Sequence, residues 1–236
     1  MSGLVPSMHT PTSPDGPTPL NGKLTVMLVD DHAVVRAGYR LLLSQAGDLE
    51  VVGEAERGEE ACQRYFELQP QVMVMDLSLP GIGGMAAIRR ICLGDPQARI
   101  LVFSIHDEPV YITRTLEAGA KGYISKSCPP DILVEAVRRV AAGQSYIEPE
   151  LAQRMAIRTS TMSDAAASLD ELSPREFDVF RLLAWGRTTR EVAETLHMGH
   201  KTASNYSTTI KNKLGVNTTA ELARLAYQAG VFKEGA

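Results

Sequence analysis

The sequence of 236 residues predicts two domains: an open, doubly wound α/β domain with a five-stranded parallel sheet, followed by a small all-α domain with a helix-turn-helix. Three observations predict this arrangement. The chain is too long for one small domain and suits two. Strand-like apolar runs alternate with helical patterns in the first half. Two short helical patterns joined by a tight turn follow in the second half.

The composition excludes a membrane protein. The chain is 44% hydrophobic and 22% charged, and no apolar run approaches the roughly 20 residues that a membrane span needs. Residues 1–22 are rich in Pro, Ser, Thr and Gly, and they lack the basic start and apolar run of a secretion signal. We therefore expect a disordered N-terminal tail over 1–22 and a cytoplasmic protein.

The expected elements of the α/β domain, residues 23–143, alternate along the chain. The strands are expected at 24–29, 50–55, 71–75, 99–104 and 122–125, and the helices at 34–46, 59–68, 85–93, 110–120 and 131–142. Parallel strands need crossover helices and are buried on both faces. Five such pairs in series therefore predict a parallel sheet with helices on both sides.

Polar residues interrupt this pattern at the strand ends. Asp30 and Asp31 end the first strand, Asp76 ends the third, Ser104 ends the fourth, and Lys126 closely follows the fifth. In a sheet of order 2-1-3-4-5, strands one and three flank the switch point, where the carboxyl ends of the strands open a crevice for ligands. We expect the three carboxylates to converge there.

These residue types predict phosphoryl-transfer chemistry. Neighbouring carboxylates repel one another unless a cation neutralises them, and Mg²⁺ suits an all-oxygen site with room for water and a phosphate oxygen. Lys126 can hold an incoming phosphoryl group, and the Ser104 hydroxyl can donate a hydrogen bond to one of its oxygens. Catalysis would then rest on positioning and charge neutralisation.

The span from Leu24 to Ala142 resembles the receiver domain of two-component systems, which has a flavodoxin-like fold. The matching motifs are DDH at 30–32, DLSLPGIGG at 76–84, FSIHD around Ser104 and GYISKS at 122–127. The resemblance implies that Asp76 is the phosphoacceptor. It implies a Mg²⁺ site made by Asp30, Asp31, Asp76 and the backbone carbonyl of Ser78, a switch hydroxyl and phosphate-binding lysine at Ser104 and Lys126, and a rotating switch aromatic at Tyr123.

Residues 144–170 are expected to form a linker, with a short helix over 151–157, before the all-α domain at 171–236. Ser173, Pro174 and Glu176 predict a capped helix start. Further helices are expected at 189–196, 200–214 and about 219–229. The net charge of −4 conceals a basic segment, because 173–213 holds seven basic residues against four acidic ones.

The helix expected at 200–214 has an exposed face of amides, hydroxyls and lysines, which suits a recognition helix but also a plain solvated face. Residues 172–226 resemble the LuxR-type helix-turn-helix of NarL/FixJ-class response regulators, with departures at Gly199, Ala203 and Tyr206. The resemblance implies pairing through the fourth helix. The implied DNA-contacting residues are Lys201, Thr202, Ser204, Asn205, Thr208, Lys211 and Lys213.

Together, the resemblances imply a DNA-binding transcriptional response regulator. A sensor histidine kinase would phosphorylate Asp76 and thereby control homodimerisation and binding to double-stranded promoter DNA. They imply no enzymatic activity apart from Mg²⁺-dependent self-phosphorylation and dephosphorylation at Asp76.

Two alternatives stand beside this reading. An aspartyl-phosphate hydrolase of the haloacid dehalogenase type also uses a strand-end Asp, but its motif needs a second Asp where this chain has Ser78. The second alternative is a constitutive DNA-binding or protein-binding regulator that has lost phosphorylation control. The activity of an Asp76→Asn variant would separate it from a phosphorylation-controlled regulator.

Overall fold

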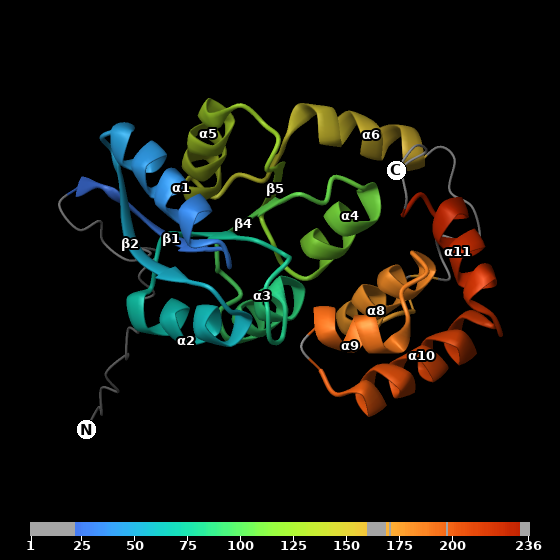
Figure 1. The fold of residues 1–236 in the computed structure, drawn as a ribbon. Coiled ribbons are helices and arrows are strands. Elements are labelled where there is room, and N and C mark those ends of the chain that lie inside the picture. The colour runs from blue at the N-terminus through green and yellow to red at the C-terminus, as the bar shows by residue number, and fades with distance from the viewer. Residues whose placement is uncertain (1–21, 160–168, 170, 197, 232–236) are drawn as a thin grey trace, which may run out of the picture.

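The computed structural model describes residues 22–159, 169, 171–196 and 198–231. Figure 1 shows an α/β domain, coloured blue to yellow-green, beside a helical domain in orange and red. The expected tail, apart from Gly22, lies outside the described residues, and so does most of the linker stretch from 160 to 170. Two domains of the expected classes are therefore present.

All strands of the α/β domain are parallel, in the order β2-β1-β3-β4-β5-β6. Their bounds are β1 Leu24–Val29, β2 Leu49–Ala55, β3 Val72–Met75, β4 Ile100–Ser104, β5 Gly122–Ser125 and β6 Tyr146–Ile147. The expected five strands and their order are confirmed. The sixth strand lies in the segment expected to be linker. It pairs with β5: Tyr146 N donates to the carbonyl of Lys121, just before β5, and the amide of Glu148, just after β6, donates to Tyr123 O, each at 3.0 Å.

Helices cover both faces of this sheet, as expected for a doubly wound fold. They are α1 Ala33–Gln45, α2 Gly58–Leu68, α3 Gly84–Gly94, α4 Pro109–Glu117 and α5 Pro130–Ala141. Alternate strand residues enter different cores: Val26 and Leu28 pack with residues of α1 and α5, whereas Met27 and Val29 pack with residues of α2, α3 and α4. The parallel pairing of β1 with β3 holds the carboxyl ends of these strands side by side between the two layers of helices.

The helical domain contains α8 Pro174–Ala184, α9 Thr189–Thr195, α10 His200–Leu214 and α11 Thr219–Gln228. The capping box expected at Ser173 is present, and Thr188 and Thr218 form two more. Gly199 begins α10 without a side-chain cap. In the preceding segment, α6 runs over Pro149–Thr159 and is longer than the helix expected at 151–157.

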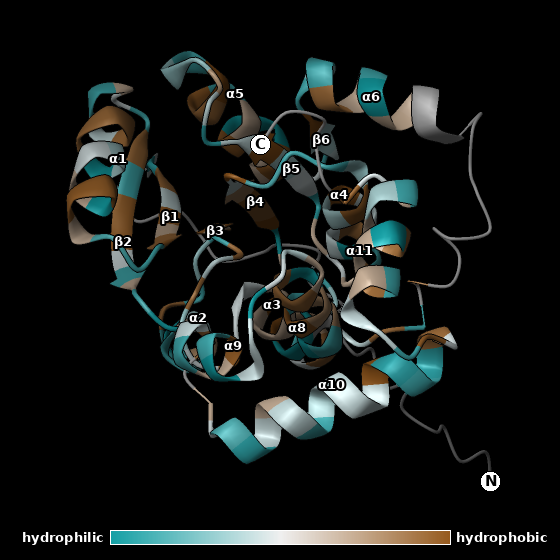
Figure 2. Cartoon of the chain, turned by 45° about the vertical axis from the view of Figure 1, so that its right-hand side comes forward, coloured by the Kyte–Doolittle hydropathy of each residue, from teal (hydrophilic) through white to brown (hydrophobic). Residues whose placement is uncertain are grey.

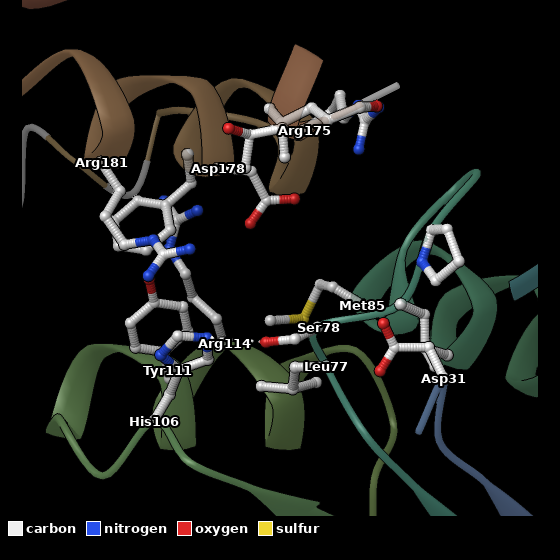
Figure 3. A pocket seen from close by; sticks show the side chains of 15 residues that line it. Asp31, Leu77, Ser78, Met85, His106, Tyr111, Arg114, Arg175, Asp178 and Arg181 are labelled. Atoms are coloured by element: carbon white, nitrogen blue, oxygen red, sulfur yellow. Dashed lines mark hydrogen bonds between the residues drawn. The ribbon is translucent and has the colours of Figure 1, made fainter. Parts of the chain in front are cut away.

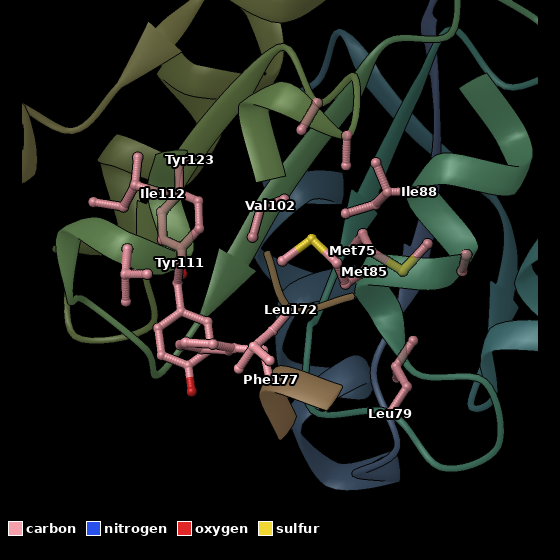
Figure 4. Close-up of a cluster of buried hydrophobic side chains, with 14 of the residues drawn as sticks. Met75, Leu79, Met85, Ile88, Val102, Tyr111, Ile112, Tyr123, Leu172 and Phe177 are labelled. Carbon is pink, nitrogen blue, oxygen red and sulfur yellow. The ribbon is translucent and has the colours of Figure 1, made fainter. Parts of the chain in front are cut away.

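The two domains share one apolar cluster. Tyr111 and Ile112 of α4, Met85 of α3, and Leu172 and Phe177 of the helical domain belong to it, as Figure 4 shows. Phe177 is 2% exposed. The domains are therefore packed against each other through α3, α4 and α8.

Candidate functional site

Two acidic residues lie side by side at the carboxyl ends of β1 and β3. Val29 and Met75 are paired across these strands, and each precedes an aspartate. The Asp76 amide donates to the Val29 carbonyl at 2.9 Å, which holds the two strand ends in register. Asp30 and Asp76 are only 4% and 3% exposed. The carboxylates expected to converge from these two strands are therefore together and buried.

Lys126 bridges them. Its Nζ lies 2.6 Å from Asp30 Oδ2 and 2.6 Å from Asp76 Oδ2. Burial raises the pKa of Asp76, and the adjacent ammonium offsets this rise only in part. Burial lowers the pKa of Lys126, but the charge of Asp76 and the hydrogen bonds to both carboxylates outweigh it and leave the pKa raised. Lys126 is therefore a protonated cation at the centre of the site.

Asp31 lies at the more open edge of this site, with its side chain 33% exposed. Its carboxylate, that of Asp30 and the His32 imidazole offer donor atoms within 4.8 Å of one another, and Asp31 Oδ1 lies 2.7 Å from His32 Nδ1. Sequence reasoning assigned His32 no role, although it follows the acidic pair directly. Asp30, Asp31 and Asp76 supply carboxylate oxygens. Because the Lys126 ammonium neutralises the buried Asp76 carboxylate only in part, a further cation is favoured here, and this all-oxygen donor set fits a hard divalent ion.

The two serines of the site are joined through His106. The Ser78 amide donates to Asp76 Oδ1 at 3.2 Å, which leaves its backbone carbonyl and its hydroxyl for other partners. The hydroxyl lies 3.1 Å from His106 Nε2. Ser104 is fully buried, and its Oγ accepts a hydrogen bond from the His106 amide at 3.3 Å. Sequence reasoning gave His106 no role, although it lies in the FSIHD motif, two residues after Ser104.

Tyr123 is fully buried inside the α/β domain, and burial raises its pKa. Its hydroxyl donates to the His106 carbonyl at 2.5 Å. The expected switch aromatic is thus held inward, against the loop that follows β4. Burial also lowers the pKa of His106 to about 4, and the nearby Arg181 guanidinium adds to this effect, so the imidazole is neutral at neutral pH.

A cavity of about 320 Å³ lies between the domains, beside the acidic site (Figure 3). Asp31 and Ser78 line it from the α/β domain, and Arg175, Asp178 and Arg181 of α8 line it from the helical domain. The helical domain therefore stands over the open edge of the acidic site, where Asp31 is accessible.

Helix α10 lies on the outside of the helical domain, away from the sheet, and Figure 2 colours much of it pale or teal. Of the expected DNA-contacting residues, Lys201, Thr202, Asn205 and Thr208 are exposed, and Ser204 and Lys211 are half-buried. Ala203 and Ile210 are fully buried and anchor the opposite face. The predicted polar face is therefore open to a partner.

Lys213 differs from the rest of this set. Its Nζ lies 2.8 Å from Glu176 Oε2 and donates to the Glu171 carbonyl at 3.4 Å. Burial alone would raise the pKa of Glu176, but the hydrogen bonds from Lys213 and Ser173 hold it below its usual range. The expected phosphate-contacting lysine therefore has an intradomain partner that joins the end of α10 to the start of α8.

None of the helices in the described ranges combines the length and the apolar composition that crossing a membrane requires.

Two family descriptions match the chain. The response regulator receiver domain matches residues 26–138, and the bacterial regulatory proteins of the luxR family match residues 170–226. The transcriptional activator protein ExaE of Pseudomonas putida is 42% identical over 88% of this chain and 98% of its own length. The response regulator GacA of Pseudomonas aeruginosa is 35% identical over 88% of this chain and 97% of its own length.

Solved structures give the same pairing of domains. RcsB from Salmonella enterica serovar Typhimurium, bound to promoter P1flhDC in the presence of the phosphomimetic BeF3−, is 27% identical over 88% of this chain and 99% of its own, with a TM-score of 0.61. Another structure of Salmonella typhimurium RcsB is 29% identical over 90% of this chain and 100% of its own, with a TM-score of 0.64. Both similarities span the α/β and the helical domain.

Proposed function

The chain belongs to the response regulators that join a receiver domain to a LuxR-type DNA-binding domain, and we propose that phosphorylation of Asp76 by a sensor histidine kinase controls its dimerisation and promoter binding. The observation that carries the proposal is the Lys126 ammonium between Asp30 and Asp76, 2.6 Å from each. A cation in this place can move from the free carboxylate to a phosphoryl oxygen without leaving the site.

The transfer needs little covalent chemistry from the protein. A carboxylate oxygen of Asp76 attacks the phosphorus of the kinase phosphohistidine, the P–N bond breaks, and the imidazole leaves with the bonding electron pair. Lys126 then holds a phosphoryl oxygen while it stays paired with Asp30. The carboxylates of Asp30, Asp31 and Asp76 and the backbone carbonyl of Ser78 would hold Mg²⁺, whose charge would balance that of the phosphoryl oxygens. Self-phosphorylation and dephosphorylation would be the domain's only chemistry.

The receiver then signals through Ser104 and Tyr123. In the unphosphorylated chain, the Ser104 hydroxyl accepts from the His106 amide and Tyr123 is held inward by the His106 carbonyl. A phosphoryl group on Asp76 offers Ser104 a charged acceptor, and hydrogen bonds to charged groups are stronger than neutral ones. Movement of Ser104 and Tyr123 toward the phosphoryl group would alter the surface of α4, against which α8 packs. Coupling of this kind is typically worth about 1 to 3 kcal/mol, enough to shift an equilibrium.

For DNA, we propose that α10 enters the major groove. Asn205, Ser204, Thr202 and Thr208 would reach base edges or phosphates, and Lys201 and Lys211 would neutralise phosphates. Lys213 would chiefly hold α10 in place through its ion pair with Glu176, and the exposed part of its side chain would lie near the DNA backbone. A homodimer paired through α11 would read half-sites about 34 Å apart. RcsB, one of the structural neighbours, is bound to DNA as dimers, which supports a dimeric DNA-bound form.

The proposed domain bounds are 23–143 for the receiver, 144–170 for the linker and 171–236 for the DNA-binding domain. The first part of the linker carries β6 and α6, so it belongs to the packed structure. A cytoplasmic location, where both kinase and promoter are accessible, completes the proposal.

The test compares wild type with Asp76→Asn. DNA binding and the mass from light scattering are measured with and without Mg²⁺ and acetyl phosphate as phosphodonor. We expect the donor to promote dimers and specific binding in wild type alone. If both proteins bind DNA equally well and ignore the donor, the chain is a constitutive regulator and the proposal fails.

A further inference from the structure

His106 lies in the loop between β4 and α4, where three groups of the phosphorylation site meet it. Its amide donates to Ser104 Oγ at 3.3 Å, and its carbonyl accepts from the Tyr123 hydroxyl at 2.5 Å. Its Nε2 lies 3.1 Å from Ser78 Oγ. These partners come from β4, from β5 and from the loop after β3, so one residue contacts three separate elements of the proposed phosphorylation site.

On its other side, His106 faces the DNA-binding domain through one aromatic ring. Its imidazole stacks on Tyr111 of α4, with the ring centroids 4.5 Å apart and the planes at 12°. Tyr111 meets Phe177 of α8 edge-on, with centroids 5.2 Å apart and planes at 78°. Figure 3 shows His106 beneath Tyr111, and Figure 4 shows Tyr111 against Phe177. Tyr111 and Phe177 are 3% and 2% exposed, so the contact is fully desolvated.

A second residue of α4 also contacts the Phe177 ring. The Arg114 guanidinium lies 4.4 Å from the centroid of the Phe177 ring and donates a hydrogen bond to the Leu169 carbonyl. Phe177 is thus held by two side chains of α4 that are three residues apart and therefore lie on one face of the helix. A shift of Tyr111 changes how α8 is seated, because Phe177 packs against its ring.

We propose, building on the proposed function, that His106 is the positioning residue that transmits phosphorylation of Asp76 to the docking of α8. When the Ser104 hydroxyl turns to a phosphoryl oxygen, the His106 amide loses its acceptor and the loop moves. The imidazole then leaves Tyr111, and the DNA-binding domain is released. Because coupling of binding equilibria is reciprocal, a docked α8 also disfavours the phosphorylated state.

The packing around the stack allows such a movement. Well-packed interiors resist displacement of a ring, but His106 and Tyr111 both line the interdomain cavity of about 320 Å³. The expected size of the effect on docking follows from the Tyr111–Phe177 contact between the domains, which the His106 ring positions. One aromatic pair contributes enough to change a docking equilibrium by roughly 2- to 12-fold. His106 therefore modulates docking, while the rest of the apolar cluster retains part of it.

The test measures amide hydrogen exchange of α4 and α8 by mass spectrometry in the full chain. His106→Ala removes the ring, His106→Phe retains a ring that can stack, and Thr113→Ala is a control on the exposed face of α4. Each protein is measured with Mg²⁺, with and without acetyl phosphate, and intact mass reports the phosphoryl group. Thermal unfolding shows that each variant is folded.

Without the donor, we expect His106→Ala to raise exchange in α8 by roughly 2- to 12-fold, and His106→Phe and Thr113→Ala to stay close to wild type. With the donor, wild type should gain exchange in α8, and His106→Ala should gain less. If His106→Ala keeps the protection of wild type, or His106→Phe loses it as fully as His106→Ala, the proposed role of the ring is overturned. If wild type gains no phosphoryl mass, the proposed function fails together with the transmission step, while the samples without donor still decide the docking role.

Discussion

Replacing Lys126 by methionine should destabilise the receiver domain unless Mg²⁺ is present. The Lys126 ammonium lies 2.6 Å from oxygens of both Asp30 and Asp76, whose side chains are 6% and 3% exposed. Methionine removes the charge and leaves two buried carboxylates facing each other. Removing one partner of a buried ion pair costs about 3 to 5 kcal/mol. Because Lys126 is 14% exposed and water can reach its place, we expect the lower end of this range.

A loss of about 3 kcal/mol corresponds to a fall in Tm of about 12 °C for a domain of this size. The measurement is thermal unfolding by circular dichroism, with and without Mg²⁺. Lys121→Met, which changes an exposed lysine just before β5, is the matched control. Mg²⁺ at the proposed carboxylate site would replace the missing positive charge, so it should raise the Tm of Lys126→Met more than that of wild type.

The loss of stability caused by Lys126→Met should also depend on pH. Burial raises the pKa of Asp76 in wild type, and the loss of the Lys126 ammonium raises it further. A folded-state pKa above the unfolded value of about 3.9 means that the folded chain binds the proton more tightly. The deficit should therefore be small at pH values below the unfolded pKa and grow as pH rises through the folded pKa. A Tm equal to that of Lys121→Met, or an equal effect of Mg²⁺ on both variants, would refute this reasoning.

Three further predictions concern other parts of the chain. Gly84→Ala should abolish acyl phosphate formation in phosphate-affinity electrophoresis, because the new Cβ would lie 2.1 Å from the backbone oxygen of Asp76, the proposed phosphoacceptor. Gly38→Ala, whose Cβ would meet nothing within 4 Å apart from the neighbouring backbone of its own helix, should be phosphorylated normally, and normal phosphorylation of Gly84→Ala would contradict the prediction. Lys201→Ala should weaken binding to all duplexes alike and reduce the salt slope by about 1 in anisotropy titrations, whereas an unchanged slope would remove Lys201 from the phosphate contacts. Burial raises the pKa of Asp178 from 3.8 to about 6, so its contribution to stability is present below pH 3.8 and lost as pH rises through about 6. In denaturant unfolding, Asp178→Asn should not show this loss of stability with rising pH. His106, whose lowered pKa makes stability rise with pH, is present in both proteins, so the difference between them isolates the contribution of Asp178.

The residues that meet at the acidic site were predictable because strand ends are local features that topology brings together. Apolar runs located β1 and β3, and parallel strands have their carboxyl ends at one edge of the sheet. Asp30, Asp76 and Lys126 meet there, as expected. Capping was equally local: Ser173 and Glu176 are three residues apart and form the expected box.

Contacts between distant segments were not predictable in this way. Strand β6 has two residues and is held by the backbone carbonyls of Lys121 and Tyr123, before and within β5, so no periodicity marks it. The sequence places Lys213 on a polar helix face, but the pairing of Lys213 with Glu176 depends on how α10 crosses α8. Nothing in the local pattern distinguishes it from Lys201.

The sequence by itself determined the two domains, the order of their elements and which residues gather at the acidic site and on α10, because these follow from periodicity, caps and strand ends within short windows. Only the tertiary structure decided that α8 packs on α4 and that His106 lies between the site and that contact. The physical reason is that packing between domains is non-directional apolar burial, which many surfaces could satisfy and no local spacing records.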